Sequence, residues 1–470
     1  MAFTRDDIAE VVSRVVDELT HRQSPAPSAK TETSGKSLGA CSSVAEAVSR
    51  AQKAFAAFRK VDLNKRRRII ARIRELGHQH LEEIARMGHE ETGLGRFEDK
   101  IEKNRLVLDK TPGIEDLQPL SFSGDDGLTL IEGAPYGVIG AITPTTNPTE
   151  TIFCNAIGMV SSGNAVVFNA HPRAKNCCNF AVHLINQAIL ENGGPGGLVN
   201  IIASPTQESA QDLMSHPGIR LLVVTGGGGI VKAAFASGKK VIAAGPGNPP
   251  AIVDETADLD QAAKNIILGA TLDNNILCIA EKEIFVVDSV ADAFIEALKR
   301  NGAYQVIGSN RQKLENLIFH DNHFDADLIG QNAGKILQKI GIQCDENLRL
   351  AFMETDKDHF LVQKEQMMPV LPVVRCPDVK TAIDWAVEAE HGNCHTATMH
   401  SRNLDALHEM AVRSDCSIFV KNGPSCAGLG YGGEGFTTMS IASPTGEGIT
   451  SARTFTRSRR CVLRGHFRIV

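Results

Sequence analysis

The stretch VIGAITPTTNP, residues 138–148, decides the fold, because an apolar run leads through a polar loop into the start of a helix. It opens a regular alternation of short β-rich runs with helical segments. The β-rich runs are Val138–Thr143, Ala165–Asn169, Val199–Ala203 and Leu221–Thr225, and the helical segments are Glu150–Val160, Asn176–Glu191, Gln207–Met214 and Ile230–Ser237. This alternation predicts an α/β fold with a doubly wound parallel sheet, in which ligands bind at the carboxyl ends of the strands.

Segments outside the alternation have other patterns. Two helical stretches, Ser43–Arg59 and Lys65–Glu91, precede it. Two further β-rich stretches, Leu128–Glu132 and Thr454–Ile469, do not belong to it. Exposed strand edges promote aggregation unless another chain covers them, so these stretches predict a homo-oligomer, either a dimer or a tetramer.

The loops at the expected strand ends suit anionic ligands and helix starts. In the first loop, Pro148 suits the first position of a helix and Asn147 suits its cap, so capping is one explanation of Asn147. The run from Thr225 through Gly229 leads into a helix, which lets backbone amides approach a phosphate. Val231 replaces the last glycine of the G-x-G-x-x-G pattern, so the standard dinucleotide fingerprint is absent.

Composition excludes several classes of protein. The formal charge of -6 and the pI of about 6.2 give no basic field for nucleic acid or anionic lipid. No apolar run approaches the ~20 residues of a membrane helix. The 11 cysteines follow no disulfide framework, which favours reduced thiols in the cytoplasm. Cys-x-x-Cys and His-Glu-x-x-His are absent, so no metal site is expected.

The first twenty residues are typical of an amphipathic helix on a tether. Six apolar residues recur on one helical face, namely Ile8, Val11, Val12, Val15, Val16 and Leu19. Residues 21–37 are rich in Ser, Pro and Ala and are expected to form a flexible linker. The helix could fold back on its own domain or on a sister subunit. Its acidic residues argue against a mitochondrial presequence.

Several motifs together resemble the aldehyde dehydrogenase superfamily. In chain order these motifs are Asn147-Pro148, Gly163-Asn164-Ala165-Val166-Val167, Thr225-Gly226, Asp273-Asn274-Asn275-Ile276-Leu277-Cys278 and the segment from Glu365 to Pro372. The resemblance implies that Cys278 is the nucleophile, that Asn147 stabilises the oxyanion and that Glu365 holds the nicotinamide ribose. The structural alternative for Cys278 is a buried inert thiol. The residues implied in cofactor binding are Thr143, Pro144, Thr145, His171, Thr225, Gly226, Gly227, Gly228, Gly245 and Glu365.

Within that superfamily the chain resembles the CoA-acylating propionaldehyde and acetaldehyde dehydrogenases of bacterial microcompartments. The segments that carry this likeness include those from Ala244 to Pro250, Glu281-Lys282, and those from Phe419 to Pro424 and from Pro444 to Gly448. In these relatives a tethered N-terminal helix is an encapsulation peptide. The resemblance therefore implies that residues 1–20 bind shell or cargo proteins, and that the protein lies in the bacterial cytoplasm inside a microcompartment.

The resemblance also implies a domain plan. Residues 38–247 are expected to form an NAD- and CoA-binding domain, interrupted by oligomerisation strands at about 122–134. Residues 248–445 are expected to form the catalytic domain, and 446–470 further oligomerisation strands.

The fate of the thioester separates acylating from hydrolytic relatives. Hydrolytic members carry a Glu immediately before the glycine of the strand that follows the Thr-Gly turn, and the matching residue is Ala244. Water needs a general base, whereas the CoA thiol is a far stronger nucleophile, so an acyl-CoA product is expected from a short-chain aldehyde such as propanal or acetaldehyde. The alternatives are a hydrolytic NAD-dependent aldehyde dehydrogenase and a non-catalytic shell adaptor.

The cofactor is expected to be NAD. The Lys-x-x-Glu loop that holds the adenosine ribose in many relatives is replaced by residues 169–173, which relaxes discrimination against NADP. Arg173 is either a phosphate contact or an exposed surface charge.

Overall fold

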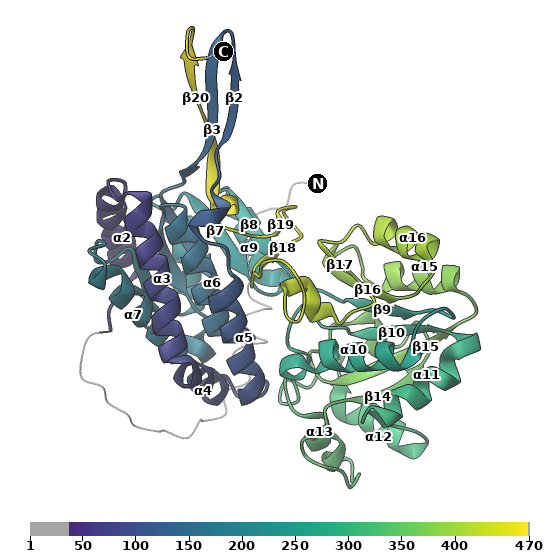
Figure 1. Cartoon of the computed structure of the whole chain (residues 1–470). Coiled ribbons are helices and arrows are strands. Elements are labelled where there is room, and N and C mark those ends of the chain that lie inside the picture. Colours follow the sequence, from purple (N-terminus) through teal and green to yellow (C-terminus); the bar gives the residue numbers. More distant parts are fainter. Residues whose placement is uncertain (1–36, 469–470) are drawn as a thin grey trace. The chain divides into compact units, whose positions relative to one another are not determined.

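The computed structural model describes residues 37–468. The amphipathic helix expected in residues 1–20 lies outside the described residues, as does nearly all of the linker. Within the described part the structure contains two parallel sheets and one antiparallel sheet, together with two short hairpins (Figure 1). The expected α/β class with a doubly wound sheet is confirmed.

The first sheet contains the alternation that begins at residue 138. Its strands, in spatial order, are β1 (Ala40–Cys41), β6 (Val199–Ile202), β5 (Ala165–Asn169), β4 (Val138–Ile142), β7 (Leu221–Thr225) and β8 (Val241–Ala244). The helices of this part are α2 (Val44–Phe58), α3 (Leu63–Gln79), α4 (Leu81–Thr92), α5 (Phe97–Lys110), α6 (Pro148–Ser161), α7 (Lys175–Glu191), α8 (Gln207–Ser215) and α9 (Gly228–Ala236). Helix α2 contacts β4, β5 and β6, α6 contacts β5, and α3 packs on α6 and α7. The strand order reverses direction between β4 and β7, which is where such sheets bind ligands.

The second sheet is also parallel and follows in the chain. Its strands, in spatial order, are β11 (Tyr304–Gln305), β14 (Ala351–Thr355), β15 (Val370–Cys376), β10 (Glu283–Val287), β9 (Pro250–Val253), β16 (Thr396–His400) and β17 (Ile418–Lys421). Its helices are α10 (Leu259–Thr271), α11 (Asp288–Arg300), α12 (Ser309–Ile318), α13 (Ala333–Lys339), α14 (Phe360–Gln363), α15 (Val379–Ala389) and α16 (Leu404–Ser414). After β17 the chain returns to the first sheet, where β18 packs beside β8.

Shorter elements complete the described fold. They are the hairpin β12 (Phe319–His320) and β13 (His323–Phe324), the hairpin β18 (Ile441–Ala442) and β19 (Gly448–Ile449), and the 3-10 turns η1 (Ile114–Asp116), η2 (Pro172–Ala174), η3 (Leu272–Asn275), η4 (Ser425–Leu429) and η5 (Arg453–Phe455).

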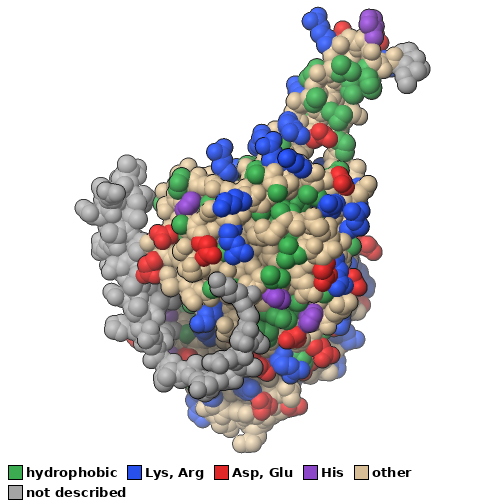
Figure 2. Space-filling model, turned by 90° about the vertical axis from the view of Figure 1, so that its left-hand side faces the viewer, with side chains coloured by type: hydrophobic (Ala, Val, Ile, Leu, Met, Phe, Trp, Pro, Cys, Tyr) green, Lys and Arg blue, Asp and Glu red, His purple; other side chains and the backbone are tan. Residues whose placement is uncertain are grey.

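The antiparallel sheet forms an arm that projects from the first sheet. It consists of β2 (Leu120–Gly124), β3 (Gly127–Pro135) and β20 (Thr456–Arg464), with β3 in the centre. Both β-rich stretches outside the alternation therefore pair with each other, with Leu130 opposite Cys461. Apolar and basic side chains lie side by side on the arm's surface (Figure 2). Its exposed apolar residues include Leu120, Phe122, Val462 and Leu463.

One predicted helix proved to be two. The stretch Lys65–Glu91 is divided at His80, where α3 ends and α4 begins. His80 has φ -108° and ψ 17°, outside the helical region, and its Nδ1 lies 2.9 Å from Glu83 Oε2. No Pro or Gly stands at His80 itself, and the nearest glycine, Gly77, lies within α3, so periodicity alone continued the helix through the break.

The first sheet carries the largest buried core, and its central strands contribute fully buried side chains. Phe168 on β5 is 0% exposed. We expect Phe168→Ala to lower the free energy of unfolding by about 3–5 kcal/mol, because it removes apolar contacts and leaves a cavity. Urea unfolding measures this change. Leu404→Ala on α16 is the control, since Leu404 is 79% exposed and its loss should change the value by less than about 0.5 kcal/mol. Equal losses in both variants would contradict the assignment of Phe168 to the core.

Candidate active site

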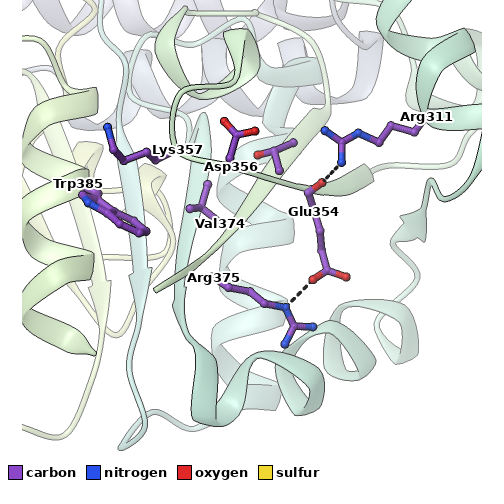
Figure 3. A pocket seen from close by; sticks show the side chains of 8 residues that line it. Arg311, Glu354, Asp356, Lys357, Val374, Arg375 and Trp385 are labelled. Carbon is purple, nitrogen blue, oxygen red and sulfur yellow. Dashed lines mark hydrogen bonds and ion pairs between the residues drawn. The ribbon is translucent and has the colours of Figure 1, made fainter. Parts of the chain in front are cut away.

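The second sheet has polar residues at both ends, but the carboxyl end holds only an internally paired set. A hollow of about 420 Å³ lies beyond β14 and β15 (Figure 3). Arg375 donates from Nε to Glu354 Oε2 at 2.6 Å and also pairs with Asp292. Arg311 donates to the Glu354 carbonyl at 2.8 Å. The chain's own oxygens thus engage part of the donor capacity of both guanidinium groups.

The amino end of the same sheet holds the expected nucleophile. Cys278 follows η3 and precedes β10, within a segment that we call the nucleophile loop, residues 272–278. Three consecutive residues of this loop, Asp273, Asn274 and Asn275, have positive φ values of 51°, 55° and 67°. Asp and Asn tolerate this left-handed conformation better than most residues, but each still adds strain. Contacts from the rest of the protein must therefore hold the loop in place.

The two asparagines are held by their own amides. Asn274 donates from Nδ2 to the Gly330 carbonyl at 2.9 Å and to Asn332 Oδ1 at 2.8 Å. Asn275 donates from Nδ2 to the Ala270 carbonyl at 2.8 Å and to the Glu281 carbonyl at 2.9 Å. These bonds anchor the loop to α10 and to the start of β10.

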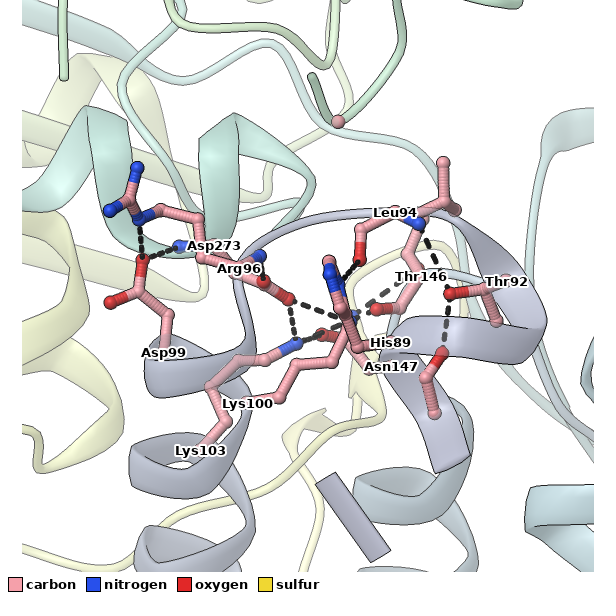
Figure 4. A network of polar contacts seen from close by, with 12 residues as sticks. His89, Thr92, Leu94, Arg96, Asp99, Lys100, Lys103, Thr146, Asn147 and Asp273 are labelled. Atoms are coloured by element: carbon pink, nitrogen blue, oxygen red, sulfur yellow. Dashed lines mark hydrogen bonds and ion pairs between the residues drawn. The ribbon is translucent and has the colours of Figure 1, made fainter. Parts of the chain in front are cut away.

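Asp273 is held by a buried cluster of charges from α5 (Figure 4). Its Oδ2 lies 2.6 Å from Lys103 Nζ and 3.0 Å from Lys100 Nζ, and its Oδ1 accepts from the Arg96 N–H at 2.7 Å. Burial alone would raise the pKa of Asp273, but the charges of Lys100 and Lys103 hold that pKa below its usual range. The carboxylate is therefore ionised and fixes the entry to the loop.

Lys103 connects this cluster to Asn147. Its Nζ donates to Asn147 Oδ1 at 2.6 Å and lies 3.2 Å from Glu150 Oε1. An ammonium group only donates, so the atom of Asn147 that faces it is the carbonyl oxygen. The Nδ2 group is thereby directed away from Lys103, which suits a donor to an oxyanion. Asn147 stands at the N-cap position of α6 but makes no capping bond, so the capping explanation is wrong, whereas Pro148 does begin the helix.

The surroundings of Cys278 disfavour its thiolate when no ligand is bound. Burial and the charge of Glu365 raise the pKa of the Cys278 thiol to about 12, while Lys282 and Lys103 act in the opposite direction. The residue nevertheless remains partly exposed, so a reagent can reach it. Burial also raises the pKa of Glu365, against the lowering effects of the Lys282 charge and of the Gly247 N–H.

Gly247 brings Cys278 close to a histidine that sequence reasoning missed. An added Cβ at this glycine would lie 2.7 Å from the Cys278 carbonyl oxygen and 3.0 Å from His395 Cγ, so only glycine fits. His395 precedes β16, and its Nδ1 lies 2.8 Å from Thr396 Oγ1. Its Nε2 has no hydrogen-bond partner among the described residues. Burial, together with the charge of Lys282, lowers the pKa of His395 to about 4, so the ring is neutral near pH 7.

The residues expected to bind the cofactor lie at the carboxyl ends of four strands in the first sheet. These residues are Thr143, Pro144 and Thr145 after β4, His171 after β5, Thr225 to Gly228 at the end of β7 and beyond it, and Gly245 after β8. Parallel pairing places all of these ends along one edge. The Gly226 N–H donates to the Ala244 carbonyl at 3.1 Å, and Thr225 Oγ1 lies 2.8 Å from Ser440 Oγ. The structure thus brings most of the predicted cofactor residues together.

The glycines after β7 leave room for a phosphate. Gly227 and Gly228 are exposed, and an added Cβ at either would meet nothing within 4 Å. They cap and begin α9, so backbone N–H groups at a helix N-terminus face open space, which fits a dinucleotide phosphate. His171 caps η2 instead, and its Nδ1 accepts from the Arg173 N–H at 3.2 Å. The Arg173 guanidinium donates to the Thr92 carbonyl at 2.8 Å, so part of its donor capacity is used within the chain.

The described part of the chain shows neither a metal-binding cluster nor a membrane-spanning helix. Residues 37–468 contain no group of three or more His, Cys, Asp or Glu side chains placed to hold a metal ion. None of the helices described here is both long and apolar enough to span a membrane.

Comparison with known proteins agrees with this geometry. Residues 17–325 match the model of the aldehyde dehydrogenase family. The acetylating acetaldehyde dehydrogenase EutE of Escherichia coli is 47% identical over 100% of both chains, and the CoA-propanoylating propanal dehydrogenase of Salmonella typhimurium is 45% identical over 94% of this chain and 95% of that one.

Solved structures are similar as well. The Rhodopseudomonas palustris propionaldehyde dehydrogenase with bound CoA and an acylated cysteine has a TM-score of 0.89 and 48% identity, covering 91% of this chain and 98% of that one. A propionaldehyde dehydrogenase from the Clostridium phytofermentans fucose utilisation microcompartment has a TM-score of 0.90 and 46% identity, covering 92% of this chain and 100% of that one. This chain belongs to the aldehyde dehydrogenase family.

Proposed function

We propose that the protein is a CoA-acylating aldehyde dehydrogenase, which converts a short-chain aldehyde, CoA and NAD into acyl-CoA and NADH. The observation that carries the proposal is the partly exposed Cys278 at the end of the nucleophile loop. Lys103 binds both Asp273 of this loop and Asn147, so it links the two. Relatives named as acetylating and CoA-propanoylating enzymes over nearly the whole chain support the acyl transfer. They also favour acetaldehyde and propanal as substrates.

The chain's own residues account for the acyl transfer. Cys278 loses its proton and adds to the aldehyde carbonyl, and Asn147 donates from Nδ2 to the oxyanion that forms. Bound NAD supplies the hydride acceptor, near Glu365 and the loops after β4 and β7. Loss of hydride from this adduct to NAD would leave a thioester on Cys278. The CoA sulfur then adds to the thioester carbonyl and gives up its proton, the Cys278 S–acyl bond breaks, and acyl-CoA leaves with the cysteine sulfur free for another turnover.

Cys278→Ala is expected to abolish aldehyde-dependent NADH formation while leaving the fold and NAD binding intact, because only the nucleophile is lost. NADH absorbance measures turnover, and isothermal titration calorimetry measures NAD binding. Cys344→Ala is the matched control, since Cys344 is also partly exposed and follows α13, outside the nucleophile loop and the cofactor edge. Residual activity above a tenth of the parent value, a barrier change below about 1.4 kcal/mol, would reject Cys278 as the nucleophile.

Ala244→Glu tests why the product is an acyl-CoA. Ala244 ends β8 and is 4% exposed, at the place where hydrolytic relatives carry their base. A carboxylate there should activate water, so acid formation without CoA should rise above the parent value. Chromatographic measurement of the free acid checks this. An unchanged acid yield in a folded variant would show that the absence of this carboxylate does not determine the product.

We also propose that the arm mediates a dimer or tetramer. Its edges and exposed apolar residues lack cover within the described chain, and a second copy would supply it. Light scattering should give a mass well above the 50.5 kDa of one chain, and Val462→Glu with Leu463→Glu should reduce it. Ile307→Glu, at an exposed residue outside the arm, should not. A parent mass near that of one chain would contradict the proposal.

Residues 1–20 are proposed to attach the enzyme to a microcompartment shell or its cargo. The amphipathic sequence pattern supports this role, as does the microcompartment named for a similar structure. Deleting residues 1–20, or changing Val12→Glu with Val16→Glu, should abolish co-sedimentation with shell proteins without changing turnover, because a carboxylate on the apolar stripe resists burial. Loss of activity or of the oligomer on deletion would place the helix in the enzyme body instead.

A further inference from the structure

Lys282 is a buried residue whose side-chain hydrogen bonds, among the described residues, all go to the nucleophile loop. It stands four residues after Cys278, immediately before β10, and is 0% exposed. Its Nζ donates to the Asn275 carbonyl at 2.7 Å, to Asn275 Oδ1 at 2.7 Å and to the Leu277 carbonyl at 3.3 Å. An ammonium has three N–H groups, so the loop uses all of them.

These hydrogen bonds satisfy carbonyl groups of the loop that require a donor. Asn275 is the last of the three left-handed residues, with φ 67°. Its backbone carbonyl and that of Leu277 point inward and would otherwise lose hydration without gaining a partner. One flexible side chain that carries three donors satisfies both carbonyls and the Asn275 amide oxygen.

The charge of Lys282 is less compensated than that of Lys103. Lys103 pairs with both Asp273 and Glu150, whereas within the described residues Lys282 forms no ion pair. Burial lowers the pKa of Lys282, and the nearby charges of Glu365, Cys278, Glu283 and Glu281 oppose that shift. No carboxylate oxygen is bonded to its Nζ within the described residues, so its field acts on the nearby Cys278 thiol as well as on these three carboxylates.

We propose that Lys282 is a positioning residue, which fixes the left-handed nucleophile loop and whose charge favours the thiolate of Cys278. The inference rests on the proposed function only in taking Cys278 as the nucleophile. Lys282 touches neither substrate nor cofactor in this role. It acts through the loop and through its electric field.

The test is the rate at which iodoacetamide alkylates Cys278 in the full chain at pH 8, followed by mass spectrometry of the peptide that contains this residue. The rate is proportional to the thiolate fraction. Lys282→Met should therefore slow alkylation by about tenfold, which corresponds to a thiol pKa raised by about one unit. Lys282→Arg, which retains the charge, should recover most of the rate.

A purely structural role predicts the opposite direction. Loosening the loop would expose the thiol, relieve its burial and speed alkylation. Lys100→Met is the matched control, because Lys100 is buried and bonded to the same loop through Asp273 but is not among the main charges acting on Cys278. It should lower thermal stability without slowing alkylation.

Alkylation of the Lys282→Met variant at the parent rate or faster would overturn the proposal, as would equal slowing in the Met and Arg variants. Lys282→Gln replaces the Met variant if circular dichroism shows that the latter is unfolded. The assay needs no turnover, so its result is independent of whether Cys278→Ala loses aldehyde oxidation.

Discussion

The site depends on the buried pairing of Asp273 with Lys100 and Lys103. Removing charges from water costs free energy, and here that cost is offset by close ion pairs and by the Arg96 N–H bond. These contacts fix Asp273, the first of the three residues with a left-handed backbone in the nucleophile loop. Because Lys103 also holds Asn147, one ammonium sets the relation between the proposed nucleophile loop and the proposed oxyanion donor.

The proposed site draws its residues from the carboxyl ends of the strands in the first sheet and from the amino ends of the strands in the second sheet. In the first sheet the cofactor residues follow the strands, where parallel sheets usually bind ligands. Cys278, Glu365 and His395 instead precede β10, β15 and β16 of the second sheet. Gly247, in the connection between the sheets, allows the Cys278 carbonyl and the His395 ring to approach each other.

Sequence reasoning predicted the elements whose signal is local. The first-sheet strands agree with their apolar runs to within a residue or so, as Leu221–Thr225 shows, because each run is buried between helices. The helix break at His80 was missed because no Pro, Gly or side-chain cap stands at that residue. Lys103 and His395 were missed because their roles depend on contacts between residues that are distant in the sequence. Helix α5 carries many charges and has the composition of a solvated helix. Its Lys100 and Lys103 are nevertheless buried against a loop about 170 residues later in the chain. No local pattern encodes such a contact.

Internal pairing at the far end of the second sheet has a consequence for how the protein can change over evolutionary time. The hollow lined by Arg311, Glu354 and Arg375 lies on the strand ends that the chemistry does not use. Substitutions there would alter ion pairs that the fold itself uses, whereas substitutions at the opposite rim would alter the proposed reactive groups as well. One sheet therefore offers a permissive margin and a restricted one, and new surface properties can arise on the former without altering the reaction on the latter.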